Sequence, residues 1–182
     1  MSQPGHSHTV IIDKGSSTPA NISHQISIPI PPGPSGAIPI AEFGLAVEQG
    51  TISNFVTLSG HVNVAAGSPF PAFSLDIVVL RVVRRNTTSP SAPVTIFETQ
   101  TGLFGGGKPV NAGILFTDGG VGKPIPTGYY SYVLTVHKQQ GSVQFNGSPT
   151  PAPFDDSSPI VIGPIQFEGT SYTTNTSSVG LN

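Results

Sequence analysis

Apolar and polar residues alternate along most of the chain, and this period of two predicts β-strands. In residues 52–64 the apolar side chains occupy even positions: Ile52, Val56, Leu58, Val62 and Val64. This pattern is typical of a strand with one face in water, and Gly60 is a place where such a strand can bend. Residues 73–83 are apolar on both faces, which predicts a central strand covered on both sides.

Further strands are predicted by the same criterion. They cover residues 38–48, 94–101, 110–117, 128–138, 142–146 and 159–168. Loops rich in glycine and proline separate them, and no window shows a clean helical period with helix caps. About eight short strands with frequent turns predict an all-β jelly-roll or β-sandwich domain without a long helix.

The first 37 residues differ from the rest of the chain. Two β-like pieces, residues 9–13 and 21–30, precede a segment dominated by proline and glycine. Such a segment cannot pair in the middle of a sheet, because proline lacks the backbone donor. We therefore expect an extended arm with a linker over residues 1–37, a β-sandwich domain over 38–168, and a polar C-terminal tail or edge strand over 169–182.

The arm has two interpretations. It is either the first strand of its own sandwich or a strand donated to a neighbouring copy by β-augmentation. The residues expected to make the contact are apolar: Val10, Ile11, Ile12, Ile22, Ile26, Ile28 and Ile30. The expected linker contains Pro31, Pro32, Gly33, Pro34 and Gly36.

Charge is scarce in this sequence. Charged residues make up 9% of the 182 residues, against about 25% in an average soluble domain. The basic residues form no dense patch, since only Arg81, Arg84 and Arg85 are close together, so we expect no nucleic-acid partner. A nearly neutral surface repels its own copies weakly and tolerates close packing between them.

The sequence also limits cross-linking and targeting. There is no cysteine, so disulfides and thiol chemistry are excluded. Residues Met1–His8 are polar and lack both a basic and an apolar region, so we expect no secretory signal. No run approaches the ~18 uninterrupted apolar residues of a membrane span, and we expect none.

No motif indicates a cofactor or a metal. The glycines before Lys108 are followed by Pro109 instead of Ser or Thr and a helix, so they favour a hairpin tip over a phosphate loop. His6 and His8 are two possible ligands where a metal site normally has three or four. Asp155 and Asp156 offer oxygen ligands for calcium, but their spacing matches no EF-hand, and a polar loop explains them equally well.

Catalysis is not indicated either. The nine acidic residues are scattered, and no Gly-X-Ser-X-Gly motif is present, so we expect neither an enzyme nor a small-molecule substrate. Tyr129, Tyr130 and Tyr132 suggest a sugar-binding platform. A core strand with alternate buried rings is the favoured interpretation.

Four features together resemble bacterial fibre subunits, in particular the endospore appendage proteins. They are the polar start at Met1–His8, the isoleucine-rich arm at Asn21–Ile30, the linker at Pro31–Gly36 and the sandwich from Ile38 to Phe167. As a family, these are small jelly-roll domains with an N-terminal connector and no signal peptide. Its best-known members cross-link through cysteines, which this chain lacks, so a fibre here would depend on donated strands and packing.

The resemblance implies a structural role. Family members are made in the mother cell and assemble on the spore into resistant fibres. We therefore expect a cytoplasmically synthesised subunit of a spore-surface or extracellular fibre, with copies of itself as head-to-tail partners. Two alternatives stay open: a virion component such as a tail, decoration or capsid protein, and a carbohydrate- or cell-surface-binding module.

Overall fold

The computed structural model describes most of the chain. The described residues are 6–17, 27–65, 75–89, 91–104, 108–139, 142–143, 152–153 and 159–177. They contain no α-helix and one short 3-10 helix, η1 (Pro34–Gly36). None of their helices is long and apolar enough to cross a membrane.

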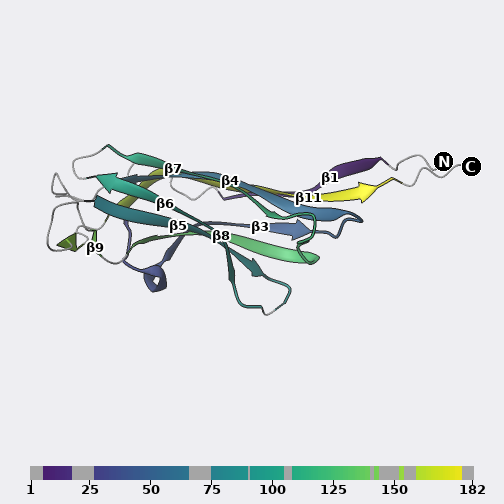
Figure 1. Cartoon of the computed structure of the whole chain (residues 1–182), viewed down its shortest axis with the longest axis horizontal. Helices are drawn as coiled ribbons and strands as arrows, with labels where there is room; N and C mark the ends of the chain where they lie inside the picture. Colours follow the sequence, from purple (N-terminus) through teal and green to yellow (C-terminus); the bar gives the residue numbers. More distant parts are fainter. Residues whose placement is uncertain are drawn as a thin grey trace, which may run out of the picture.

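Two antiparallel sheets pack face to face and form a sandwich (Figure 1). The first sheet contains, in spatial order, β1 (Ser7–Ser17), β11 (Ile160–Thr176), β4 (Ser53–Ala65) and β7 (Val110–Gly119). The short strand β2 (Ser27–Pro29) also pairs with β11. The second sheet contains β3 (Ile38–Val47), β8 (Gly128–Lys138), β5 (Leu75–Asn86) and β6 (Val94–Phe104). A small separate pair joins β9 (Ser142–Val143) to β10 (Ala152–Pro153).

The strand order is that of a jelly roll. When the eight long strands are counted along the chain, the first sheet has the order 1-8-3-6 and the second 2-7-4-5. Each sheet therefore alternates strands from distant parts of the sequence, as in two interlocked Greek keys. The expected all-β jelly-roll or β-sandwich class is confirmed.

The core lies between the two sheets and follows the predicted alternation. On β4, Val56, Leu58, Val62 and Val64 are fully buried. β5 is a central strand and is buried on both faces, as its two-sided apolar pattern predicts. Burial of each such side chain stabilises the fold by roughly 1.5–3 kcal/mol relative to its exposure.

The C-terminal segment differs from the expected tail or edge strand. β11 continues to Thr176 and is a central strand, with β1 on one side and β4 on the other. Its inward positions beyond Phe167 are Gly169, Ser171 and Thr173, all of them buried. Small and hydroxyl side chains at these positions carry no apolar signal, so the sequence pattern ends about eight residues too early.

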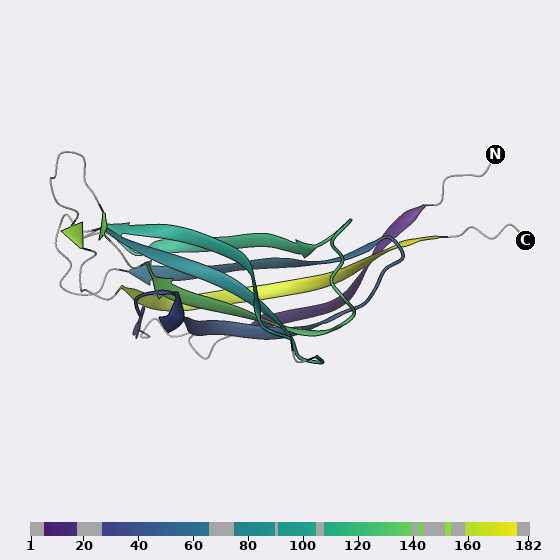
Figure 2. The ribbon, with the colours of Figure 1, turned by 60° about the horizontal axis from the view of Figure 1, so that its bottom comes forward.

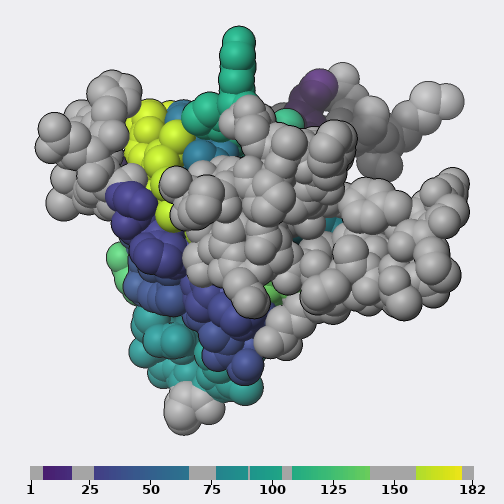
Figure 3. Space-filling model, turned by 90° about the vertical axis from the view of Figure 1, so that its left-hand side faces the viewer, coloured from purple at the N-terminus to yellow at the C-terminus, as the bar shows by residue number. Residues whose placement is uncertain are grey.

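The end of the expected arm, from Ile30 onwards, belongs to the domain in the structure. Ile30 is fully buried in the core of its own chain, so the boundary at residue 37 places this residue on the wrong side. The segment after it is not a free linker, because the Lys138 amide donates to the Pro31 carbonyl and the Gly33 amide donates to the Lys138 carbonyl. Figure 3 shows dark-blue residues, the colour of β2, beside the yellow-green start of β11 at the end opposite to the termini.

Candidate functional site

β1 lies at the open edge of the first sheet and reaches the open edge of the second. It pairs with β11 from Ser7–Thr176 to Ser17–Phe167. The start of β1 and the end of β11 lie side by side at one end of the molecule (Figure 2). None of its eleven residues, all of them described, is buried. β1 is therefore held by its edge contacts rather than by apolar side chains in the core.

A β-bulge decides which side chains of β1 face the second sheet. The register with β11 shifts between Ile11 and Asp13, so that Ile11 faces Tyr172 and Asp13 faces Ser171. A bulge inserts one extra residue and reverses the alternation of faces that follows it. As a result, Asp13, Gly15 and Ser17, after the bulge, face β3. Ile11, before the bulge, lies on the outer face.

Side chains of β1 accept hydrogen bonds from the free edge of β3. The Ala46 amide donates to Asp13 Oδ2 over 2.8 Å, and the Glu42 amide donates to Ser17 Oγ over 3.2 Å. Ser171 on β11 completes the contact, because its hydroxyl donates to the Ala46 carbonyl over 2.7 Å. These bonds satisfy edge groups of β3 that would otherwise be open to pairing with another strand.

Gly15 allows β1 to approach the second sheet closely. A Cβ atom there would lie 2.6 Å from the Gly44 carbonyl oxygen and 2.7 Å from Phe43 Cδ2. Gly15 is the register partner of Gly169, whose own Cβ would lie 2.8 Å from Phe43 Cζ. The Phe43 ring thus occupies the space that the two glycines leave, and it also contacts Phe167 with ring centroids 4.8 Å apart.

We define the β1 site as the backbone of β11 from Phe167 to Thr176 together with the backbone of β3 from Glu42 to Ala46, including the Phe43 ring. It binds an extended segment through a sheet ladder on one side and through edge amides on the other. Its requirements on that segment are a carboxylate, a glycine and a hydroxyl at alternate positions, which Asp13, Gly15 and Ser17 supply.

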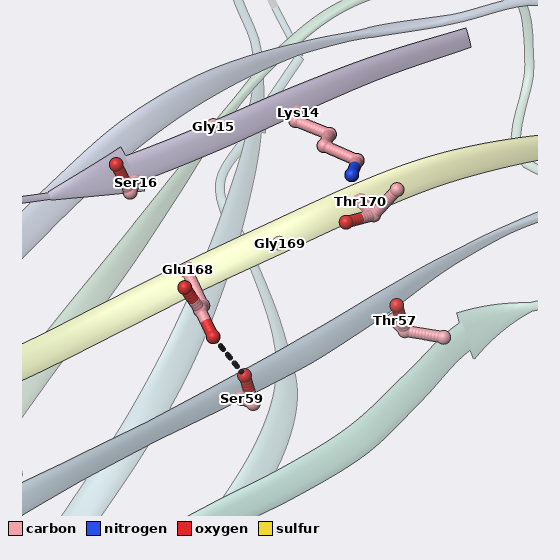
Figure 4. A pocket seen from close by; sticks show the side chains of 8 residues that line it. All are labelled: Lys14, Gly15, Ser16, Thr57, Ser59, Glu168, Gly169 and Thr170. Atoms are coloured by element: carbon pink, nitrogen blue, oxygen red, sulfur yellow. Dashed lines mark hydrogen bonds between the residues drawn. The ribbon is translucent and has the colours of Figure 1, made fainter. Parts of the chain in front are cut away.

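The outer face of the same region is a shallow polar hollow of about 380 Å³ (Figure 4). Gly15 and Gly169 form part of its lining, and Lys14, Ser16, Thr57, Ser59, Glu168 and Thr170 supply the surrounding side chains. Figure 4 shows Glu168 directed along the face to Ser59, whose hydroxyl donates to it over 3.0 Å. The hollow and the Phe43 contact thus lie on opposite faces of one glycine pair.

The predicted contact residues are distributed unevenly. Val10 and Ile11 lie on β1 with 42% and 49% of their surface exposed, and Ile12 is half-buried beside the bulge. Ile28 packs against the core from β2. Ile22 and Ile26 lie outside the described residues.

The anchoring residues of β1 were missed by the apolar pattern. Asp13, Gly15 and Ser17 belong to a polar stretch that is typical of a turn. The available signal is the alternation Asp-X-Gly-X-Ser that directly follows the apolar run Val10–Ile12.

The tyrosine strand is part of the core. Tyr130 is 3% exposed and Tyr132 fully buried, while Tyr129 is the exposed member of the three. Burial raises the pKa of the Tyr132 hydroxyl, and the neighbouring Asp118 carboxylate raises this pKa further. The rings of Tyr130 and Tyr132 are therefore not accessible to a sugar.

A partly buried ion pair links the two sheets beside these tyrosines. Arg84 Nη1 lies 2.7 Å from Asp118 Oδ2, and the Tyr132 hydroxyl donates to the same carboxylate oxygen over 3.2 Å. Asp118 thus binds both Arg84 and Tyr132. The cluster is therefore structural.

The remaining motifs are those considered as metal or phosphate sites. Within the described part of the chain, no group of three or more His, Asp or Glu side chains is arranged to hold a metal. His8 Nδ1 lies 3.0 Å from the Ser177 hydroxyl at the exposed end of β1. The glycines before Lys108 and the Asp155–Asp156 pair lie outside the described residues.

No protein-family model matches this chain, and no curated protein matches it.

Proposed function

We propose that this protein is a structural subunit that polymerises head to tail, with β1 of each copy occupying the β1 site of the next. The observation that carries the proposal is the character of β1. This strand fills the open edges of both sheets, yet it buries none of its described residues in the core. In the single chain β1 occupies its own site, and the same contacts can form between two copies.

Departure of β1 leaves the core intact and exposes a reactive edge. The buried apolar residues belong to the other strands and to short connecting segments, so the domain keeps its apolar interior. The vacated β11 and β3 edges then present unpaired amides and carbonyls, which favour pairing with a strand from another molecule. Exchange of an identical element between copies is a low-cost route to assembly.

Chain length permits the exchange. Residues 18–26 join β1 to β2, and nine residues span at most about 30 Å when extended. β1 can therefore move away from its own domain while β2 and Ile30 stay in place.

In head-to-tail donation each copy uses one surface to give and a different one to receive, and this produces an open filament when the rotation between copies does not close into a ring. The low charge of the chain, with a net value of −2, permits dense packing of the copies. The resemblance to endospore appendage proteins favours a fibre on the spore surface or outside the cell.

Negative-stain electron microscopy of the full chain tests the proposal. We expect filaments from the full chain and dispersed, folded subunits from a chain that lacks residues 1–17. The deletion ends before Ile30 because that residue belongs to the core. Monodisperse monomers from the full chain, or filaments from the shortened one, would refute strand donation, and closed particles would favour the virion alternative.

A further inference from the structure

We infer that the β1 site selects its occupant by sequence: it accepts an extended segment with the pattern Asp-X-Gly-X-Ser and rejects a side chain at the glycine position. This inference rests on the proposed function, because it names the partner of the same site as β1 of a second copy. It goes further by assigning the selection to Asp13, Gly15 and Ser17, outside the apolar run that precedes them.

Glycine is required by the geometry of the middle position. The nearest obstacle to a Cβ atom at Gly15 is the Gly44 carbonyl oxygen, a backbone atom that cannot move without distorting β3. The second obstacle is the Phe43 ring, which is fixed by Tyr132 and Phe167 at centroid distances of 5.8 and 4.8 Å. Even alanine at this position has to displace the second sheet, and a β-branched residue has to displace it further.

The two flanking positions set the register. Asp13 and Ser17 accept from amides of Ala46 and Glu42, four residues apart on each strand and in antiparallel order. If the strand shifted by two residues, Gly15 would lie opposite one of these amides. Glycine has no side-chain acceptor, so that hydrogen bond would be lost. The three contacts therefore specify one alignment of the segment.

The intervening positions are free to vary. Lys14 and Ser16 point to the outer hollow (Figure 4), and no hydrogen bond of the described residues joins either side chain to the β1 site. They provide matched controls, since they differ from the selecting residues by one position along the strand.

Peptide capture by the full chain tests the inference. The receptor is the full chain with Gly15→Val, whose own β1 no longer fits, and the probe is a fluorescent peptide of residues 6–17 followed by anisotropy. We expect this receptor to bind the natural peptide. We expect Asp13→Ala in the peptide to weaken binding roughly tenfold or more, Gly15→Val to abolish it, and Lys14→Ala to leave it unchanged.

A second receptor guards against misfolding of the first. The full chain with Asp13→Ala and Ser17→Ala keeps Gly15 but holds its β1 less tightly, and it should capture the natural peptide with the same order of preference among the peptide variants. Equal binding of the natural and Gly15→Val peptides, or no capture by either folded receptor, would overturn the inference.

The outcomes separate this inference from the proposed function. Selective capture by a chain that forms no filaments would retain the selectivity of the site and remove the fibre proposal. Filaments whose formation is unaffected by Gly15→Val would retain the fibre proposal and remove the selectivity.

Discussion

The two sides of the sandwich close by different means. On the β1–β3 side, short polar side chains bind edge amides, and a glycine packs against an aromatic ring. On the β6–β7 side, Phe97 and Phe116 contact each other with centroids 5.2 Å apart. An ion pair also joins the two sheets there, because Arg84 Nη1 on β5 lies 2.7 Å from Asp118 Oδ2 on β7.

The difference bears on the strand exchange that we propose. In the proposed exchange, the contacts through the backbone and through Asp13 and Ser17 would be re-formed by the same segment of another copy. Opening of the β6–β7 side would expose aromatic surface and leave a half-buried charge without its partner, which is costly. We therefore propose that the β1–β3 side is the exchangeable side and that the β6–β7 side is the permanent side.

The largest expected effect belongs to the permanent side. Asp118→Ala leaves Arg84 and the Tyr132 hydroxyl without their acceptor and should lower the free energy of unfolding by about 3 kcal/mol. This is the lower end for a broken buried pair, because the Arg84 side chain is 21% exposed. Urea unfolding measures it, and Asp118→Asn, which keeps an acceptor for Tyr132, should cost less. A loss no larger than that of Asp13→Ala would remove the contrast between the two sides.

A smaller and more local effect is expected on the exchangeable side. Asp13→Ala should lower the free energy of unfolding by about 1.5 kcal/mol and Ser17→Ala by about 0.5–1 kcal/mol, because each removes one hydrogen bond to the β3 edge. Amide exchange should accelerate at Ala46 or Glu42, respectively, with little change on β5. Ser16→Ala, on the outer face, should stay within about 0.5 kcal/mol of the natural chain. Equal effects of Ser16→Ala and Ser17→Ala would contradict the assigned contacts.

Acidification should weaken both sides together. His137 is a buried residue of β8, and its Nδ1 has no hydrogen-bond partner among the described residues. Burial lowers the pKa of His137 below 6.5, and Arg81 lowers this pKa further while Glu98 opposes the shift. The unfolded chain therefore binds a proton at a higher pH than the folded chain, so stability falls as pH decreases below about 6.5.

Thermal unfolding between pH 7 and 5 measures this dependence. His137→Gln should flatten the decline, because it removes the group whose pKa differs between the folded and the unfolded chain. Loss of amide protection on the β1–β3 side alone, with the β6–β7 side unchanged, would contradict a global effect of His137.

Much of the fold follows from the alternation of apolar residues. The strand at residues 128–138 is predicted with both of its ends, and the buried positions of β4 and β5 agree with their patterns. The order of strands within the two sheets does not follow, because alternation describes each strand alone and carries no information on its neighbours.

The candidate site was predictable only in part. The apolar run Val10–Ile12 indicates a strand, but the residues that anchor it are polar or glycine and favour a turn in isolation. The same physics hides the second half of β11, where Gly169 has to be small because Phe43 from the other sheet fills its space. Both misses arise where a contact between sheets, rather than local burial, selects the residue.

Disulfide trapping tests the central claim most directly, since the natural chain contains no cysteine. Thr9 and Thr174 are register partners on β1 and β11, and their hydroxyl oxygens lie 3.2 Å apart. One chain with Thr9→Cys and another with Thr174→Cys are refolded together, oxidised and separated on a denaturing gel without reductant; each variant alone is the control. Donation between copies predicts a covalent dimer that forms in the mixture and exceeds either control. Monomers alone in the mixture, with an internal disulfide in a chain that carries both substitutions, would contradict it.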